Sequence, residues 1–316
     1  METIVSSATR EVRIGGENPF CIIGERINPT GRRIFQEQLR RGDLSRIEID
    51  VIEQVAGGAM MLDVNMGAPL ADEVALMVQA IELIQSLCDL PLCLDSSIIE
   101  VLEAGLAAYQ GKALVNSVTA EDERMAAILP LVKRHGAAVI ALPNDEEEIP
   151  EEPERRLELA CKIVDVATGT YGIALEDIVF DPLAMPVGAD TSLVLRTLET
   201  IALLRENLGV NMTLGASNVS FGMPERGMIG AAFLPMAIAS GLTSAIMDAR
   251  SAQLVRAVKA ADLLTNRDPW GGNWIAAHRQ RQAAAEASQA AAASHPTGAS
   301  QPAGASQPAG ADAAPP

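Results

Sequence analysis

The sequence is poor in aromatic residues, cysteine and histidine. Phe, Trp and Tyr make up 3% of its 316 residues, whereas hydrophobic residues as a whole make up 48%. Ala, Leu, Ile, Val and Met must therefore fill the core, and the length suits one large α/β domain. The cysteines lie among apolar residues without Cys-x-x-Cys spacing, which favours buried, reduced thiols in a cytoplasmic protein. They are Cys21, Cys88, Cys93 and Cys161.

Positive charge is also scarce, because 24 Lys and Arg stand against 41 Asp and Glu, a net charge of -17. An acidic surface repels phosphate backbones and anionic lipids, so we expect neither nucleic acid nor a membrane surface as a partner. One local basic patch is a candidate, with Arg32-Arg33 followed by Arg40-Arg41. No basic and then apolar signal peptide opens the sequence. The uncharged stretch 228–247 is broken by proline and glycine, which predicts a helix and a strand rather than a membrane span.

Short apolar, β-branched runs alternate with longer amphipathic segments along most of the chain. This alternation is typical of βα units around a parallel sheet. Eight strands, each followed by a helix, predict a closed (β/α)8 TIM barrel, and an open doubly wound sheet is the alternative. The eight runs are 21–28, 59–66, 90–96, 113–119, 137–143, 178–184, 212–218 and 244–249.

The two ends of the chain differ from this pattern. Alternation at Val12-Arg13-Ile14, followed by two glycines, predicts that residues 1–18 form a hairpin closing the barrel floor. The barrel itself is expected over 19–278. Residues 279–316 are mostly Ala, Ser, Gln, Gly and Pro and contain a near-repeat, so we expect a disordered tail, with a transient helix over 283–293.

Polar side chains end most of the predicted strands, which is where sites assemble in such barrels. A single Ser, Asp or Asn there is as easily a helix cap. Asp63 and Asn65, however, are two apart inside a strand, and Asp95 and Asp181 directly follow apolar runs. Inward carboxylates are costly unless a donor meets them, so their convergence predicts a site for a small polar ligand. The candidates are Glu25, Asn28, Asp63, Asn65, Asp95, Asn116, Asp181, Ser217, Asn218 and Asp248.

The residue types at these strand ends narrow the chemistry. The three histidines lie elsewhere, which argues against Ser-His-Asp and zinc hydrolases. No Walker loop or G-x-G-x-x-G follows a strand, so nucleotide binding is not expected. Magnesium on Asp63, Asp95 and Asp181 is a weaker alternative to a site without metal. Carboxylates and amides without histidine suit a ligand rich in N–H donors, such as an amino-pterin ring.

Six motifs occur in a fixed order along the chain, and together they resemble those of the pterin-binding methyltransferases. They are IGERINPTG (23–31), DVNM (63–66), LDSS (94–97), GKALVNS (111–117), FDP (180–182) and GASNVSF (215–221). This family comprises the methyltetrahydrofolate:corrinoid (iron–sulfur protein) methyltransferases and the folate domain of cobalamin-dependent methionine synthase. The resemblance covers about Pro19 to Asn266. It implies a pterin-binding barrel like that of dihydropteroate synthase, usually homodimeric, that moves a methyl group between N5 of 5-methyltetrahydrofolate and the cobalt of a corrinoid.

The resemblance also implies roles for individual residues. Asp95, Asn116 and Asp181 would hydrogen-bond the pterin ring, and Asn218 would bind it near N5 as the catalytic residue. N5 is a poor leaving group until it gains positive charge, and an amide can accept from the protonated nitrogen. No residue is an obvious general acid, so we expect the proton to arrive through water. The other candidates would support the site: Glu25, Asn28, Asp63, Asn65, Ser217 and Asp248.

Two absent motifs refine this expectation. No Asp-x-His-x-x-Gly corrinoid motif occurs, so a separate protein should carry the corrinoid. No cysteine cluster for zinc-bound homocysteine occurs, so this chain alone should not make methionine.

Dihydropteroate synthase is the main alternative function, but its expected strand-seven Lys and strand-eight Arg-x-His are missing. A non-catalytic folate-binding protein is another alternative. Phe221 occupies a position that is polar in some corrinoid methyltransferases. The corrinoid partner, the pathway and the direction of transfer stay open.

Overall fold

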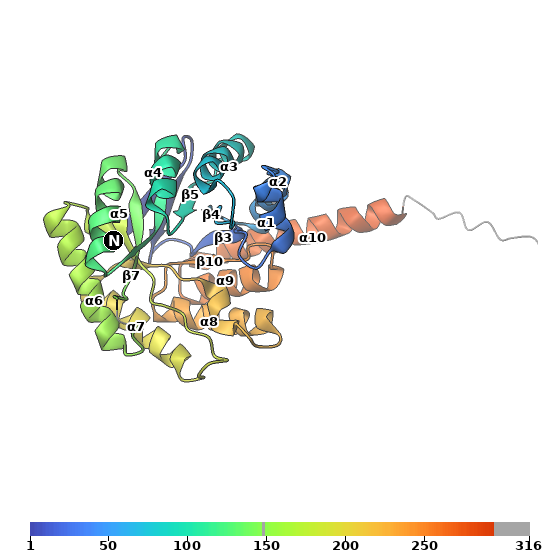
Figure 1. The fold of residues 1–316 in the computed structure, drawn as a ribbon. Coiled ribbons are helices and arrows are strands. Elements are labelled where there is room, and N and C mark those ends of the chain that lie inside the picture. The colour runs from blue at the N-terminus through green and yellow to red at the C-terminus, as the bar shows by residue number, and fades with distance from the viewer. Residues whose placement is uncertain (147–148, 294–316) are drawn as a thin grey trace, which may run out of the picture. The chain divides into compact units, whose positions relative to one another are not determined.

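The computed structural model describes residues 1–146 and 149–293 (Figure 1). Eight parallel strands form one sheet in the order β10-β3-β4-β5-β6-β7-β8-β9. The two ends of this order meet where Gly215 bridges Ile246 and the Ile246 N–H donates to the Leu214 carbonyl over 2.9 Å. The barrel is therefore closed, which confirms the predicted (β/α)8 fold. The strands are β3 (Cys21–Ile27), β4 (Met61–Asn65), β5 (Leu92–Asp95), β6 (Leu114–Thr119), β7 (Ala138–Leu142), β8 (Ile178–Phe180), β9 (Asn211–Met212) and β10 (Ser244–Met247).

Within the compact unit Met1–Gly271, helices surround the strands (Figure 1). Their ends show ordinary helix-capping chemistry: the Asp72 carboxylate accepts from the Ala75 N–H at the start of α3, and Gly136 ends α5 at a φ of 60°. Among the described residues, no helix has the length and apolar character needed to cross a bilayer. The helices are α1 (Arg33–Arg40), α2 (Ser45–Gly57), α3 (Glu73–Leu87), α4 (Ile99–Ala108), α5 (Asp122–His135), α6 (Pro153–Asp165), α7 (Leu193–Leu208), α8 (Arg226–Ser240), α9 (Ala252–Leu264) and α10 (Gly272–Ala293).

Each strand supplies side chains to two apolar layers because successive residues point to opposite faces. In β4, Leu62 and Val64 pack outward against the helices, whereas Met61 joins the cluster inside the barrel. The interior cluster also contains Cys93 and Leu114 from the next two strands. At the next inward position of β4, β5 and β6, at the carboxyl ends, the side chains are polar: Asp63, Asp95 and Asn116. The barrel therefore has an apolar floor below a polar mouth.

The N-terminal hairpin closes the floor. β1 (Glu2–Ser6) and β2 (Glu11–Gly15) pair antiparallel. Val5, Val12 and Ile14 are buried in the interior cluster, which confirms the predicted plug.

Two predicted boundaries differ from the structure. The run 212–218 was expected to be a strand, but β9 ends at Met212 and a 3₁₀ helix (Ala216–Ser220) follows, because the chain turns at Gly215 after a single bridge to β10. Residues 279–293 were expected to belong to a disordered tail with a transient helix over 283–293. They lie in α10, whose Ala-rich composition favours a helix. One compact unit spans Met1–Gly271, and α10 belongs to a second. The near-repeat lies in residues 294–316, outside the described residues.

Gly57 brings α2 against the segment that follows β10. A Cβ atom at Gly57 would lie 2.1 Å from the Ala249 carbonyl oxygen, where only glycine fits. We expect Gly57→Ala to lower the free energy of unfolding by about 1–3 kcal/mol, because backbone must move. Gly16→Ala is the matched control, since nothing lies within 4 Å of its Cβ position. Urea unfolding of both variants measures the difference, and equal stability would contradict the close approach.

Candidate functional site

A cavity of about 510 Å³ opens at the carboxyl ends of the barrel strands. Eight of the ten predicted site residues line it, although they come from six different strands or the loops after them. They are Glu25, Asn28, Asp63, Asp95, Asn116, Asp181, Ser217 and Asn218. Asn65 and Asp248 are not part of its lining. The structure therefore brings together the four side chains expected to hold a pterin.

Asp63 lies deepest and is 2% exposed. Its Oδ1 accepts from Asn116 Nδ2 over 3.3 Å. Burial, together with the nearby Asp95 charge, raises the pKa of Asp63 well above 3.8. Asp63 and the Asn116 amide thus form one hydrogen-bonded floor to the cavity.

Asp95 neighbours this pair in the sheet register, opposite Asn65 on one side and Asn116 on the other. Asn65 donates from Nδ2 to Asp95 Oδ2 over 2.9 Å and accepts from the Gly67 N–H over 2.7 Å. Burial raises the pKa of Asp95, and the Asn65 bond works against that shift. Asn65 thus acts through Asp95: it fixes one carboxylate oxygen and leaves the other to the cavity.

Asp181 stands across the mouth, directly after β8. Its Oδ1 accepts from the Leu183 N–H over 2.8 Å. The guanidinium of Arg156, in α6, is completely buried and donates to the carbonyls of Pro182 (2.8 Å) and Leu183 (3.2 Å). Burial raises the pKa of Asp181 to about 7, although the Leu183 bond and the Arg156 charge lower it. Arg156 therefore holds the loop that presents this carboxylate.

Asp181→Asn is expected to stabilise the ligand-free protein more at pH 8 than at pH 5. With a pKa of about 7 instead of 3.8, Asp181 keeps its proton in the folded state where the unfolded chain has released it. The stability that this bound proton contributes is fully present below pH 3.8, the pKa in the unfolded chain. It is lost as the pH rises to the folded pKa of about 7. The uncharged amide removes that loss, worth roughly 4 kcal/mol at pH 8 and roughly 2 kcal/mol at pH 5. Urea unfolding at the two pH values measures it, and equal effects at both would refute the assignment.

Glu25 and Asp248 differ in their surroundings. Burial and the Asp248 charge raise the pKa of Glu25, whereas a hydrogen bond from Ser217 lowers it. Burial would raise the pKa of Asp248 too, but Arg250 outweighs it and lowers that pKa, with two bonds of 2.9 Å to the carboxylate. Asp248 lines a smaller neighbouring cavity that also contains Glu25. It is therefore an ion-pair partner beside the main cavity.

Asn218 lies at the outer rim, exposed, on the 3₁₀ helix after β9. A Cβ at Gly215 would lie 3.0 Å from Asn218 Nδ2, so the amide folds back over that glycine. Arg226 steadies the same turn by donating to the Ser217 carbonyl over 2.7 Å. Phe221 follows and is 68% exposed. The amide is thus accessible from both the cavity and the outside.

Three arginines that were not among the predicted site residues lie in the cavity wall: Arg26, Arg32 and Arg226. Strict alternation would turn Arg26 away from the cavity. The pairing of β3 with β4 shifts register between Gly24 and Ile27, however, so that Glu25 and Arg26 both line it. The buried Gln54 supports this irregularity by accepting from the Arg26 N–H over 2.9 Å. Among the described residues, no three His, Cys, Asp or Glu side chains are grouped to hold a metal ion.

The profile of one family, described as pterin binding enzyme, matches residues 24–248. The chain belongs to this pterin-binding family. It is 32% identical over 260 residues to the methionine synthases of Mycobacterium tuberculosis and Mycobacterium leprae. The match covers 78% of this chain but only 22% of each relative, so the chain spans about a fifth of their length.

Solved structures with a similar fold include two dihydropteroate synthases. The enzyme of Xanthomonas albilineans in complex with 7,8-dihydropteroate has a TM-score of 0.64 and 20% identity. The match covers 83% of this chain and 98% of that enzyme's chain. The enzyme of Yersinia pestis has a TM-score of 0.60 and 14% identity. The match covers 84% of this chain and 100% of that enzyme's chain. At these identities the likeness shows a shared barrel fold.

Proposed function

We propose that the protein transfers the N5 methyl group of 5-methyltetrahydrofolate to, or from, the cobalt of a corrinoid carried by a separate protein. The observation that carries the proposal is the single cavity in which Asp95, Asn116, Asp181 and Asn218 meet. The identity to methionine synthases supports it further. We take the enzyme to be a cytoplasmic homodimer, and light scattering tests the dimer.

The buried carboxylates suit the donor edge of a pterin. Burial raises the pKa of both Asp95 and Asp181, so each ionises at a cost in the free protein. A ring that offers an exocyclic amine and ring N–H groups would supply charge-assisted hydrogen bonds and offset that cost. The Asn116 amide can both donate and accept, which matches a ring that carries a carbonyl beside its N–H groups.

Asn218 would meet the reacting end of the ligand. It is exposed while Asp63 and Asp95 lie inside, so a pterin anchored by the acids would point its N5 side toward the rim. The amide oxygen would accept from protonated N5 and stabilise the positive charge that makes nitrogen a leaving group. The corrinoid supplies the nucleophilic cobalt that receives the methyl group. The open rim beside Phe221 leaves room for it to approach.

Dihydropteroate synthase is the second candidate because its structures share the barrel. The residues after β9 are Ser217 and Asn218 rather than lysine. After β10 the arginine is Arg250, which binds Asp248 and Glu53 and does not line the main cavity. These differences favour methyl transfer.

The test mixes the protein with 5-methyltetrahydrofolate and cob(I)alamin and follows the visible spectrum for methylcobalamin. A parallel reaction supplies p-aminobenzoate and a pterin pyrophosphate. We expect turnover in the first mixture and none in the second. Product in the second alone would establish the synthase, and folate binding without turnover in either would leave a binding protein.

A further inference from the structure

Arg156, on α6, is a completely buried arginine that joins two loops at the mouth of the barrel. Its Nε donates to the carbonyl of Pro150, in the loop after β7, over 2.7 Å. Its Nη1 donates to the carbonyls of Pro182 (2.8 Å) and Leu183 (3.2 Å), in the loop after β8. Nη2 is buried without a hydrogen-bond partner in the described part of the chain. Arg156 does not line the main cavity, so it can act on a ligand only through other groups.

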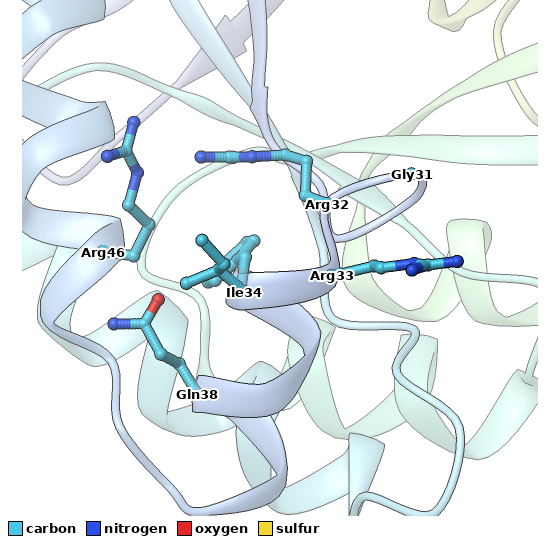
Figure 2. A pocket seen from close by; sticks show the side chains of 7 residues that line it. Gly31, Arg32, Arg33, Ile34, Gln38 and Arg46 are labelled. Carbon is cyan, nitrogen blue, oxygen red and sulfur yellow. The ribbon is translucent and has the colours of Figure 1, made fainter.

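The charge of this buried guanidinium is not balanced by a carboxylate in direct contact. The ion pairs of the described residues include its neighbours Arg155 and Arg196 but not Arg156. Two arginines show the usual arrangement in a cavity of about 490 Å³ after β3, where Arg32 extends toward Arg46 (Figure 2). The completely buried Asp50 accepts from both, over 2.7 and 2.9 Å. A buried charge without such a partner is costly, so the charge of Arg156 calls for a role.

One peptide group connects Arg156 with Asp181. Its carbonyl, that of Pro182, accepts from Arg156 over 2.8 Å. Its N–H, that of Leu183, donates to Asp181 Oδ1 over 2.8 Å. A positive guanidinium polarises the peptide group that it binds, which strengthens the bond from the N–H to a carboxylate. Burial raises the pKa of Asp181, whereas this N–H and the Arg156 charge lower it.

The same peptide group is held in place by an unusual backbone conformation. Leu183 has a φ of 61°, in the left-handed region that residues with a side chain rarely adopt. Its carbonyl accepts from Arg156 and also from Thr197 Oγ1, over 3.3 Å. Such a conformation persists only where the surrounding contacts impose it. Contacts from α6 and α7 thus fix the direction of the N–H that meets Asp181.

We infer that Arg156 is a positioning residue for the proposed reaction: through the Pro182–Leu183 peptide group it orients Asp181 and favours the carboxylate that would bind the pterin. The inference rests on the proposed function. A carboxylate accepts charge-assisted hydrogen bonds from the amine and the ring N–H of a pterin, whereas a neutral acid forms weaker ones. An arginine that only joined the two loops would not change how Asp181 responds to pH.

Other charged groups surround Arg156 and Asp181, and the variants below leave them unchanged. Those near Arg156 are Arg196, Glu151 and Glu152, and those that share the cavity with Asp181 are Glu25, Asp63, Asp95 and the three wall arginines. These groups titrate alike in wild type and variant, so a difference between the two reports the Arg156 charge.

The experiment measures, by calorimetry, the dissociation constant of 5-methyltetrahydrofolate from about pH 5 to about pH 9. In wild type the affinity should rise as Asp181 ionises at a pKa of about 7. Arg156→Gln should move this rise upward by about one pH unit, which weakens binding roughly 5-fold at pH 7 and much less at pH 9. Arg156→Lys keeps the charge and should keep the wild-type midpoint. Arg155→Gln is the matched control, because it removes an exposed arginine from the next position of α6 and should change neither quantity.

The outcomes separate this inference from the proposed function. Absence of folate binding by wild type at every pH would refute the proposed function itself. With binding present, the inference alone is overturned by a wild-type affinity that does not rise near pH 7, or by a loss in Arg156→Gln that is equal at every pH or absent. The same upward shift in Arg155→Gln would overturn it too. Thermal melting checks folding, and if Arg156→Gln does not fold, the Arg156→Lys midpoint decides: an unshifted value supports the role of the charge, and a shifted value overturns it.

Discussion

Asn218→Ala is expected to slow methyl transfer by about 10²- to 10³-fold while changing folate affinity much less. The amide lies at the rim, where it would meet N5, whereas the carboxylates that would anchor the pterin lie inside the barrel. Its bond to N5 strengthens as the nitrogen becomes positive, so its loss raises the barrier more than it weakens the ground state. Single-turnover transfer to cob(I)alamin and equilibrium folate binding measure the two effects.

Two further variants sharpen this result. Asn218→Asp keeps an acceptor oxygen and should retain more activity than the alanine variant if the residue accepts from protonated N5. Asn207→Ala removes an exposed amide on α7 that donates to the Leu203 carbonyl, and it should leave both the transfer rate and the folate affinity unchanged. A full single-turnover rate in Asn218→Ala would remove Asn218 from the mechanism.

The cavity-facing acids were predictable because every second residue of a barrel strand faces the interior. Met61 and Asp63 share the inward face of β4, so the place where apolar residues give way to Asp marks the mouth. Asp95 and Asp181 follow the same rule on their own strands. The prediction of these acids needs only that the strands are regular and that their carboxyl ends lie at the same end of the barrel.

The differences arise where contacts between distant segments override that regularity. Asp248 satisfied the same pattern, but Arg250 binds it beside the cavity. Arg26 enters the cavity wall through the shifted pairing of β3, which depends on Gln54 from α2. Arg156 comes from α6, and its burial beneath the loop after β8 leaves no periodic trace in the sequence.

Asp95→Ala is expected to weaken folate binding by about 2–4 kcal/mol, or roughly 30- to 1000-fold, because pterin donors would be left unpaired in a site shielded from water. The folate affinity of Asp95→Asn should fall between those of wild type and Asp95→Ala, since an amide keeps one acceptor oxygen. Asp89→Asn, at an exposed carboxylate paired with Arg10, is the matched control and should leave affinity unchanged.

Stability distinguishes a ligand-binding acid from a structural one at this position. Burial raises the pKa of Asp95, so its ionised form costs folding free energy at neutral pH in the ligand-free protein. Asp95→Asn should therefore be more resistant to urea at pH 8 than wild type while binding folate less tightly. A carboxylate kept for the fold would show the opposite sign, losing stability on replacement. Unchanged folate affinity in Asp95→Ala would mean that the ring is held elsewhere.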